Sequence, residues 1–269
     1  MIKIAGSLVN SNTIINNYTQ NSTEKQIVSI LASSSKVYNY DSQNQLDFEL
    51  KLRESIINAA KDLYQSHLSF KIFRKSKCNQ DFWNRTMEGG FALKYGIKPS
   101  EAIKDIFIHS SSYGTECSTA IVIIYYKALL DIFPEELFNS LFSQIYLMNW
   151  QHLDSDLGIV DYMNAADYLP GDCRYFKNPD VDPLNPEWQG ENVIDLGNNI
   201  YFGHGIGIAD AEKIIEKLNK KRISGSKVSA YLMNFAKRPN FKYLSYKYDS
   251  FSPRLQETGI PIESIKMQL

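Results

Sequence analysis

The sequence lacks the features that mark secreted, membrane-spanning and disordered proteins. It has only three cysteines, Cys78, Cys117 and Cys173, and this small, odd number excludes a disulfide framework. Its longest apolar run, residues 120–126, is much shorter than the roughly 20 residues that a membrane-spanning helix needs. The first residues contain no apolar core of a secretory signal. We therefore expect a protein made in a reducing cytoplasm, with no membrane partner.

The sequence also lacks an excess of charge of either sign. Lysine and arginine total 29 and aspartate and glutamate total 30, which gives a formal net charge of −1. This balance gives no electrostatic reason to expect nucleic-acid binding, although basic and aromatic residues are interleaved in the tail after residue 240. Hydrophobic residues form 43% of the chain, which is enough for a packed core in one large domain of 269 residues.

Two helices can be predicted from hydrophobic periodicity. Apolar residues recur at helical spacing over residues 47–64, which is typical of a helix with one face on a core. Residues 117–132 are apolar around most of the helix circumference, which predicts a helix buried on all sides. Small residues precede this second helix, and Thr115 among them is the expected N-cap.

The second half of the chain favours short strands. The predicted strands comprise residues 173–176, 192–196, 200–202 and 228–235. A turn signal, Gly197-Asn198-Asn199, joins the two middle strands into a hairpin. Pairing across this turn places residue 191 opposite residue 204 or 205.

Cys117 is the strongest candidate for a nucleophile, because it lies at the start of the buried helix. Free backbone N–H groups and the positive end of the helix dipole lower the pKa of a thiol in that position. The same N–H groups can bind an oxyanion that forms on an attacked carbonyl group. The alternative is that Cys117 is a small buried hydrophobic residue without a chemical role.

The predicted hairpin supplies candidate partners for this thiol. Glu191 precedes its first strand and His204 ends its second, so both side chains should lie at the same end of the sheet. A cysteine that opens a central helix and packs against a small sheet carrying the base is the arrangement of papain-like enzymes. A lone histidine or glutamate is more often structural, but the joint placement of the three residues favours an α+β fold with a papain-like core.

Other motifs fit metal or phosphate sites poorly. The glycine-rich run 203–207 precedes a helix but has neither the Rossmann nor the P-loop spacing, so it favours a sharp turn beside the site. His152, Asp154 and Asp156 lack the glycine and the distal glutamate of an EF-hand loop, and no pair of cysteines or histidines has zinc spacing. We therefore expect neither a metal nor another cofactor.

Longer motifs give the sequence its resemblance to a known family. In chain order they are FELKLR at 48–53, YGTECSTAIVIIYY at 113–126, GDCRYFKNP at 171–179, WQGENVI at 188–194 and FGHGIGI at 202–208. In this order they resemble the spore-coat transglutaminases of spore-forming bacteria. The resemblance implies a compact, calcium-independent enzyme with a papain-like (NlpC-type) core that makes ε-(γ-glutamyl)lysine cross-links between spore-coat proteins.

The resemblance also implies roles for individual residues. The family's nucleophile falls on Cys117, its base on Glu191, a neighbouring essential carboxylate on Glu116 and its histidine, whose role is less defined, on His204. The aromatic residues that line the family's substrate tunnel fall on Phe70, Trp150 and Trp188.

The implied reaction poses an energetic question. The Cys117 thiolate attacks the side-chain amide of a protein glutamine, ammonia leaves, and a lysine amine then attacks the thioester. Ordinary pKa values near 8.5 for cysteine and 4.3 for glutamate leave a gap of about 4 units, or about 6 kcal/mol, against proton transfer to Glu191. Burial raises the pKa of Glu191 and the helix N-terminus lowers that of Cys117, whereas the charge of Glu116 opposes the second effect. A dry, aromatic passage favours transfer to lysine over hydrolysis.

The resemblance ends near residue 240. We therefore expect a single catalytic domain over residues 1–240 and a C-terminal extension over residues 241–269 that is dispensable for the chemistry. The expected partners are spore-coat proteins that carry reactive glutamine and lysine, and the enzyme is expected to act as a monomer, first in the cytoplasm of the sporulating mother cell and then in the spore coat. The alternatives are a papain-like cysteine peptidase or amidase that acts on cell-wall peptides, and a coat component without activity.

Overall fold

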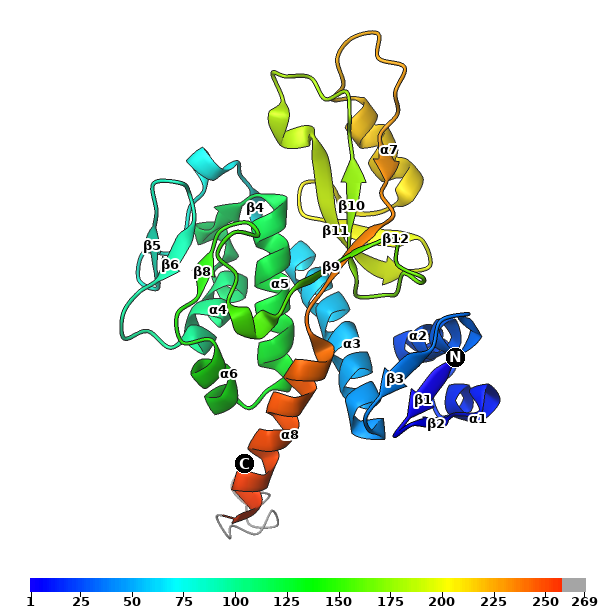
Figure 1. The fold of residues 1–269 in the computed structure, drawn as a ribbon. Helices are drawn as coiled ribbons and strands as arrows, with labels where there is room; N and C mark the ends of the chain where they lie inside the picture. The colour runs from blue at the N-terminus through cyan, green and yellow to red at the C-terminus, as the bar shows by residue number, and fades with distance from the viewer. Residues whose placement is uncertain (258–269) are drawn as a thin grey trace.

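The computed structural model describes residues 1–257 as an α+β protein (Figure 1). The helices are α1 (Ser11–Asn16), α2 (Thr23–Ser33), α3 (Gln43–Ser66), α4 (Pro99–Ile108), α5 (Cys117–Ile132), α6 (Glu135–Leu141), α7 (Ala211–Asn219) and α8 (Phe241–Glu257). Single 3-10 turns are η1 (Phe73–Lys75), η2 (Ser110–Ser112), η3 (Ser155–Leu157) and η4 (Pro186–Trp188). Within residues 1–257 no helix combines the length and the hydropathy needed to cross a lipid bilayer.

The strands are mostly short and belong to several sheets. They are β1 (Ile2–Ile4), β2 (Ser7–Leu8), β3 (Tyr38–Tyr40), β4 (Ser69–Phe70), β5 (Trp83–Arg85), β6 (Phe91–Leu93), β7 (Gly114–Thr115), β8 (Tyr146–Leu147), β9 (Val160–Met163), β10 (Cys173–Lys177), β11 (Gly190–Gly197), β12 (Ile200–Gly203), β13 (Gly207–Asp210), β14 (Tyr231–Leu232) and β15 (Phe235–Arg238). The main sheet has the order β13-β12-β11-β10-β15-β9, with β14 also paired to β10.

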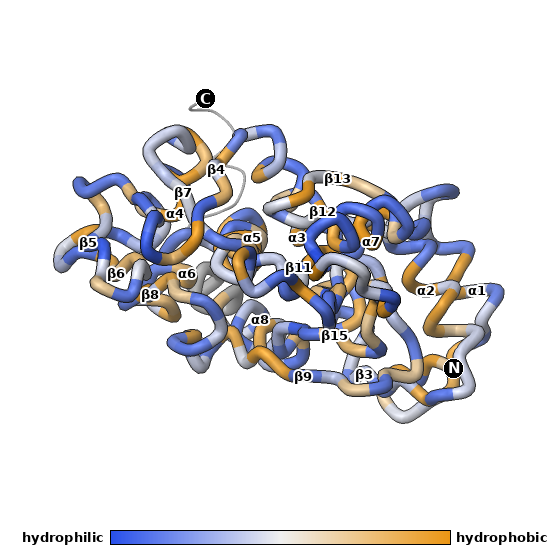
Figure 2. The backbone as a smooth tube through the Cα atoms, turned by 90° about the horizontal axis from the view of Figure 1, so that it is seen from above, coloured by the Kyte–Doolittle hydropathy of each residue, from blue (hydrophilic) through white to orange (hydrophobic). Residues whose placement is uncertain are grey.

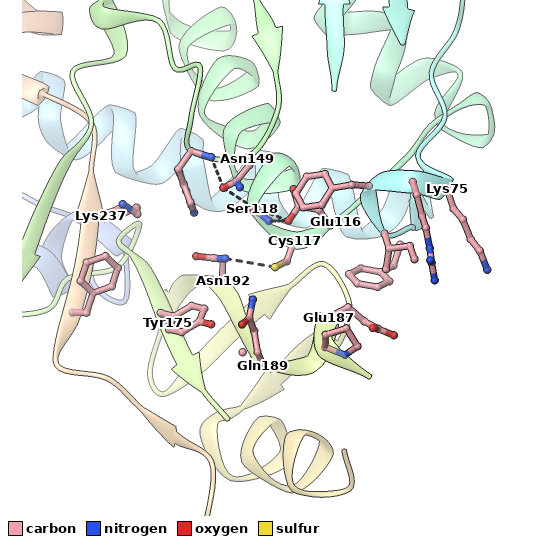
Figure 3. Close-up of a pocket in the computed structure, with 18 of the residues that line it drawn as sticks. Lys75, Glu116, Cys117, Ser118, Asn149, Tyr175, Glu187, Gln189, Asn192 and Lys237 are labelled. Atoms are coloured by element: carbon pink, nitrogen blue, oxygen red, sulfur yellow. Dashed lines mark hydrogen bonds between the residues drawn. The ribbon is translucent and has the colours of Figure 1, made fainter. Parts of the chain in front are cut away.

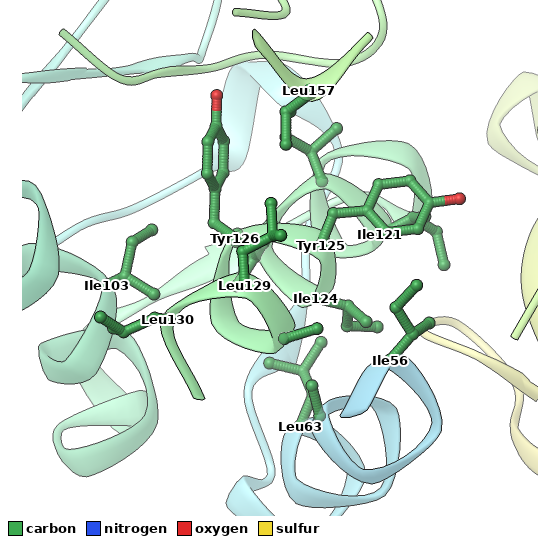
Figure 4. Close-up of a cluster of buried hydrophobic side chains, with 14 of the residues drawn as sticks. Ile56, Leu63, Ile103, Ile121, Ile124, Tyr125, Tyr126, Leu129, Leu130 and Leu157 are labelled. Atoms are coloured by element: carbon green, nitrogen blue, oxygen red, sulfur yellow. The ribbon is translucent and has the colours of Figure 1, made fainter. Parts of the chain in front are cut away.

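Helix α5 lies at the centre of the fold. It begins at Cys117, and residues 118–126 are all buried, as the apolar pattern predicts. Figure 2 shows its hydrophobic colouring, and Figure 4 shows Ile56 and Leu63 of α3 beside Ile124 of α5 in the main hydrophobic cluster. The expected helix over residues 47–64 is present as α3, which begins four residues earlier and ends two residues later.

The hairpin β11-β12 places Glu191 as the turn signal predicts. Val193 pairs with Gly203, so residue 191 lies level with residue 205 at the same end of the sheet. The helix α5 packs against β11, and the expected arrangement of a buried helix on an antiparallel sheet is therefore present.

The predicted strand over residues 228–235 is wrong in its extent. Two separate strands, β14 and β15, occupy residues 231–232 and 235–238 instead. The backbone N–H of Ala230 donates to the Asn219 side chain at 2.8 Å, and the N–H of Phe235 donates to the carbonyl of Met233 at 2.9 Å. These local bonds divert the chain at both ends of β14.

The N-terminal residues form a smaller unit with its own apolar cluster. Strands β1, β2 and β3 pair with one another, and helices α1 and α2 pack beside them (Figure 1). Residues Leu46 and Leu50 at the start of α3 belong to the same cluster, so α3 connects this unit with the core around α5.

Helix α8 begins at Phe241, the first residue of the expected C-terminal extension. Phe241 and Leu244 in its first turns are buried in the main hydrophobic cluster, and the ring of Tyr248 stacks on Phe133 with centroids 5.9 Å apart. The division of the chain after residue 240 stays a prediction, and residues 258–269 of the expected extension lie outside the described part. The described part packs on α3, so its removal should cost stability.

We predict that Leu244→Ala lowers the free energy of unfolding by about 2–4 kcal/mol, because it leaves a cavity at a fully buried position. Tyr246→Ala on the same helix is the control, since Tyr246 is 67% exposed and its loss should cost less than about 0.5 kcal/mol. Denaturant unfolding of both variants measures the difference. Equal stability of Leu244→Ala and the unchanged protein would mean that α8 does not contribute to the core.

Candidate active site

A cleft of about 900 Å³ opens beside the N-terminus of α5. Its walls come from residues around η1, from the loop at Asn149 and Trp150, and from β10, β11 and β15. Figure 3 shows Cys117 between these walls, with its sulfur directed toward Asn192.

The N-cap of α5 is Glu116 and not Thr115, which corrects the expectation from the sequence. The buried Glu116 carboxylate accepts hydrogen bonds from the backbone N–H groups of Ser118, at 2.6 Å, and Thr119, at 2.7 Å. It also accepts hydrogen bonds from both of their hydroxyl groups. Two of the backbone N–H groups at the start of the helix are therefore occupied by a carboxylate of the protein itself.

The thiol of Cys117 is less acidic than its position in the sequence suggests. Burial raises its pKa well above the ordinary value, and the negative charges of Glu191 and Glu116 raise it further. The side-chain Nδ2 of Asn192 donates to Sγ at 3.5 Å, which opposes these effects without reversing them. The pKa of this thiol is therefore raised and not lowered as expected, first because the thiol is buried and then because Glu191 and Glu116 are negatively charged.

Glu191 has the raised pKa that the sequence predicts. It is only 2% exposed, and its Oε1 accepts a hydrogen bond from the backbone N–H of Gly205 at 3.1 Å. Burial raises the pKa of this carboxyl to about 8, and the charge of Glu116 adds to the effect. Gly203 makes room for it, since a Cβ at that position would lie 2.8 Å from the Glu191 Cγ.

The titrations of Cys117 and Glu191 are linked, because the charge of Glu191 is one of the causes that raise the pKa of the thiol. The repulsion that raises the pKa of the thiol exists only while Glu191 is ionised. Transfer of the thiol proton to Glu191 removes that charge, so the thiolate forms beside a neutral acid. The cost of transfer is therefore smaller than the separate pKa values of the two groups suggest.

His204 is not among the groups that contribute most to the raised pKa of Cys117. It directly follows β12, and its ring packs on Phe70 with centroids 6.0 Å apart. Burial lowers its pKa to about 4, although the nearby backbone of Ser69 and Thr115 acts in the opposite direction. Its Nε2 has no hydrogen-bond partner among the described residues, so the structure holds it as a neutral ring beside the cleft.

Two of the three expected aromatic residues line the cleft, and the third packs on one of them. Phe70 and Trp150 line the cleft itself. Trp188 packs on Phe70 with ring centroids 6.1 Å apart, while its neighbours Glu187 and Gln189 line the cleft. Contact of substrate with all three rings stays a prediction.

Asn192 and Tyr175 are site residues that the sequence reasoning missed. Tyr175 lies opposite Asn192 on the adjacent strand β10 and lines the cleft. Burial and the charges of Cys117 and Glu191 raise the pKa of Tyr175 to about 12, so its hydroxyl stays protonated beside the thiol. The only signal for Asn192 in the sequence is its place directly after Glu191, and strand alternation argues against two neighbours facing one site.

The residues around the cleft offer no metal centre. No group of three or more histidine, cysteine, aspartate or glutamate side chains within residues 1–257 is arranged to hold a metal ion.

A cysteine at the start of a buried helix, beside a buried carboxyl group that can take its proton, is suited to acyl transfer through a thioester. The comparisons with known proteins agree with this class. Residues 1–249 match the family model described as protein-glutamine gamma-glutamyltransferase. The chain belongs to this family and is a transglutaminase, an acyltransferase that acts on protein glutamine and lysine.

Individual relatives cover almost the whole chain. The protein-glutamine gamma-glutamyltransferases of Bacillus cereus (strain B4264) and Bacillus mycoides (strain KBAB4) are each 44% identical over 97% of this chain and 94% of their own length. The solved transglutaminase of Geobacillus stearothermophilus, described as lacking its C-terminal extension, is 48% identical with a TM-score of 0.73. That match covers 77% of this chain and 98% of the other, and it confirms the papain-like core.

We predict that Glu191→Gln reduces the rate of amine incorporation by about 10²–10⁴-fold, because it keeps the shape of the site and removes the base. Glu191 accepts a proton only when ionised, so the rate of the unchanged enzyme should rise with pH up to and through about 8. Initial rates between about pH 6 and pH 10 measure this rise, which should disappear in Glu191→Gln.

Glu116→Gln is the matched control for this pH profile. The amide cannot accept from both Ser118 and Thr119, so we expect a loss of about 1–3 kcal/mol in the free energy of unfolding. Its rate should also fall, but the rise with pH should persist. If the rise of the rate with pH is lost in folded Glu116→Gln and kept in Glu191→Gln, Glu116 and not Glu191 is the base.

Proposed function

We propose that this transglutaminase cross-links proteins of the bacterial spore coat, with Cys117 as the nucleophile and Glu191 as the general base. The observation that carries the assignment is the pairing of a half-buried thiol with a fully buried carboxyl group whose pKa is about 8. The resemblance of the sequence motifs to spore-coat transglutaminases, together with relatives in two Bacillus species, supports the coat as the place of action.

The first half of the proposed reaction forms a thioester. Glu191 takes the proton of the Cys117 thiol, and the thiolate attacks the side-chain amide carbon of a donor glutamine. The protonated Glu191 then gives its proton to the departing nitrogen, and ammonia leaves. The proton of the thiol has then left with the ammonia. Cys117 is held as a neutral thioester, and Glu191 is ionised again.

The second half transfers the acyl group to lysine. A neutral lysine ε-amine attacks the thioester carbon, and Glu191 takes one proton from the attacking nitrogen. The carbon–sulfur bond breaks, and the sulfur recovers that proton from Glu191. The products are an isopeptide bond and the starting form of the enzyme.

Asn192 provides the oxyanion donor in this proposal. The backbone N–H groups of Ser118 and Thr119 are bound to the Glu116 carboxylate, so they cannot also bind the oxygen of a tetrahedral intermediate. Among the described residues the side-chain amide of Asn192 is a hydrogen-bond donor to Sγ, and it is buried and held on β11. The oxyanion forms on the carbon that becomes bonded to Sγ. A hydrogen-bond donor that already reaches Sγ is therefore close to the position of that oxygen.

The aromatic wall has a separate use in the second half of the reaction. Water competes with lysine for the thioester, and Phe70, Trp150 and Phe235 reduce the polar surface that water can occupy in the cleft. We further propose that the enzyme works as a monomer without calcium, in the mother-cell cytoplasm and then in the coat, on coat proteins that carry glutamine and lysine.

We predict that the purified protein incorporates a fluorescent primary amine into casein with release of one ammonia per amine, and that a calcium chelator does not stop it. Cys117→Ala should abolish both signals. Cys173→Ser and Cys78→Ser are the controls, since Cys173 is buried in β10 and Cys78 lies outside the cleft lining. Cleavage of peptides without amine incorporation would instead support a cysteine peptidase.

We predict that Asn192→Ala lowers kcat for amine incorporation by about 10²–10³-fold, with a much smaller change in KM. An oxyanion donor acts mainly in the transition state, whereas a residue that only supports the cleft would change KM and stability as well. Steady-state kinetics with a glutamine peptide, together with thermal unfolding, separate the two roles. A variant with unchanged kcat would remove Asn192 from the reaction.

A further inference from the structure

The wall of the cleft next to Phe70 carries an unusual density of positive charge. Lys71, Arg74, Lys75 and Lys77 fall within seven residues, and all four side chains are exposed. Arg74 and Lys75 line the cleft, together with the apolar side chains of Ile72 and Phe73 between the cations. No carboxylate of the described residues forms an ion pair with any of the four.

This basic segment, residues 71–77, is attached at both ends to the strand that leads into the nucleophile. The N–H of Lys71 donates to the carbonyl of Thr115 at 2.8 Å, and Lys77 and Gly114 exchange two backbone hydrogen bonds of 2.8 and 3.0 Å. A Cβ on Gly114 would lie 2.7 Å from the Cγ of Lys71 and 3.3 Å from that of Lys77, so both stems pack over this glycine. The backbone of the basic segment therefore keeps a set position relative to Cys117.

Hydrogen bonds from Arg85 and Ser76 support the middle of the basic segment. The Arg85 guanidinium donates to the carbonyls of Phe73 and Ser76 at 3.0 and 2.8 Å. The Ser76 hydroxyl donates to the carbonyl of Gly89 at 2.7 Å. Arg74 and Lys75 are thus presented from a held backbone, which makes them a more selective binding surface than lysines on a free loop.

The opposite side of the cleft has a different electrostatic character. Figure 3 shows Lys237 and Lys75 on opposite sides of Cys117. Lys237 is paired with Asp161 at 2.5 Å, and its ammonium group lies 4.9 Å from the centre of the Trp150 ring. Its charge is therefore neutralised, whereas the charges of Arg74 and Lys75 are available to a substrate.

The two substrates differ in the charge of the group that must reach Cys117. The donor glutamine side chain is neutral, whereas the acceptor lysine is a cation before it loses its proton. Unpaired cations repel the acceptor and attract a donor segment with negative side chains. Resting on the transglutaminase activity proposed above, we propose that the basic segment binds carboxylate side chains that flank the reactive glutamine of the donor protein.

The proposal can be tested with capped peptides that contain a single glutamine flanked by aspartate, serine or arginine on both sides. A fluorescent primary amine serves as the common acceptor. At low salt, kcat/KM should decrease in the order aspartate, serine, arginine, with about a 3- to 10-fold step between aspartate and serine. The order should weaken at about 0.5 M salt, because these charges are exposed to solvent and are screened.

Charge reversal in Arg74→Glu/Lys75→Glu should reverse the preference between aspartate and arginine donors, whatever its effect on the overall rate. Lys61→Glu/Lys227→Glu is the matched control: it changes the net charge equally, and neither residue lines the cleft. It should keep both the rate and the preference. If the first variant does not fold, Lys75→Gln and the salt dependence of the unchanged enzyme give the same information.

A final experiment uses a lysine peptide as the acceptor. The aspartates then flank this lysine, and the glutamine peptide carries no charge. No gain in rate is expected there. Equal kcat/KM for the three donors at low salt, a preference unaffected by Arg74→Glu/Lys75→Glu, or a gain only from acidic acceptors would each overturn the proposal. Failure of every peptide to incorporate amine, in contrast, would contradict the proposed function itself.

Discussion

The buried carboxylate of Asp172 joins the parts of the chain that shape the active site. It accepts hydrogen bonds from Arg53 of α3 at 2.8 Å and from Arg238 of β15 at 2.7 and 2.6 Å. The backbone N–H of Leu169 donates to it as well, at 2.9 Å. Although burial acts in the opposite direction, the two arginines hold the pKa of Asp172 below its ordinary value, so the group stays charged inside the protein.

The Asp172 network also reaches the N-terminal unit. Arg53 pairs with Glu49 at 2.8 Å, and Tyr40 of β3 donates to the same carboxyl group. Asp172 directly precedes β10, and β10 pairs with β11, which carries both Glu191 and Asn192. Removing one partner from such a network leaves an uncompensated buried charge, which typically costs about 3–5 kcal/mol. The strand β10, which pairs with the strand carrying Glu191 and Asn192, is thus anchored at its start by ion pairs that lie outside the cleft.

The sequence is a good guide to the elements that depend on local pattern. The apolar run after Cys117 predicts a fully buried helix, and the turn at Gly197-Asn198-Asn199 predicts a hairpin that brings Glu191 to the level of residue 205. Both elements are set by periodicity and turn chemistry, which are properties of neighbouring residues. The raised pKa of Glu191 follows from the same placement, because a carboxyl group inside a two-layer core loses its water.

Features that depend on where a particular side chain makes its hydrogen bonds could not be predicted from the local sequence pattern. Thr115 has the preferred residue type for an N-cap, but the longer side chain of Glu116 reaches two backbone N–H groups and displaces it. This choice of cap affects the chemistry, since Glu116 occupies two backbone N–H groups and its charge adds to the burial and the Glu191 charge that raise the pKa of Cys117. The donor contact from Asn192 also depends on long-range packing of β11 against α5, which has no local signature.

Burial solves two problems of this active site at once. A carboxylate is ordinarily too weak a base for a thiol, and withdrawal from water makes Glu191 about 4 units more basic than an exposed glutamate. The thioester, once formed, has to survive until a lysine arrives, and this requires that water be scarce near the same atoms. In the proposed mechanism, burial strengthens the base, and the aromatic side chains of the cleft limit the access of water to the thioester. A histidine base would not need such burial, because its ordinary pKa is already near neutrality. The proposed use of a glutamate as the base therefore depends on its buried position on β11 beside Gly205.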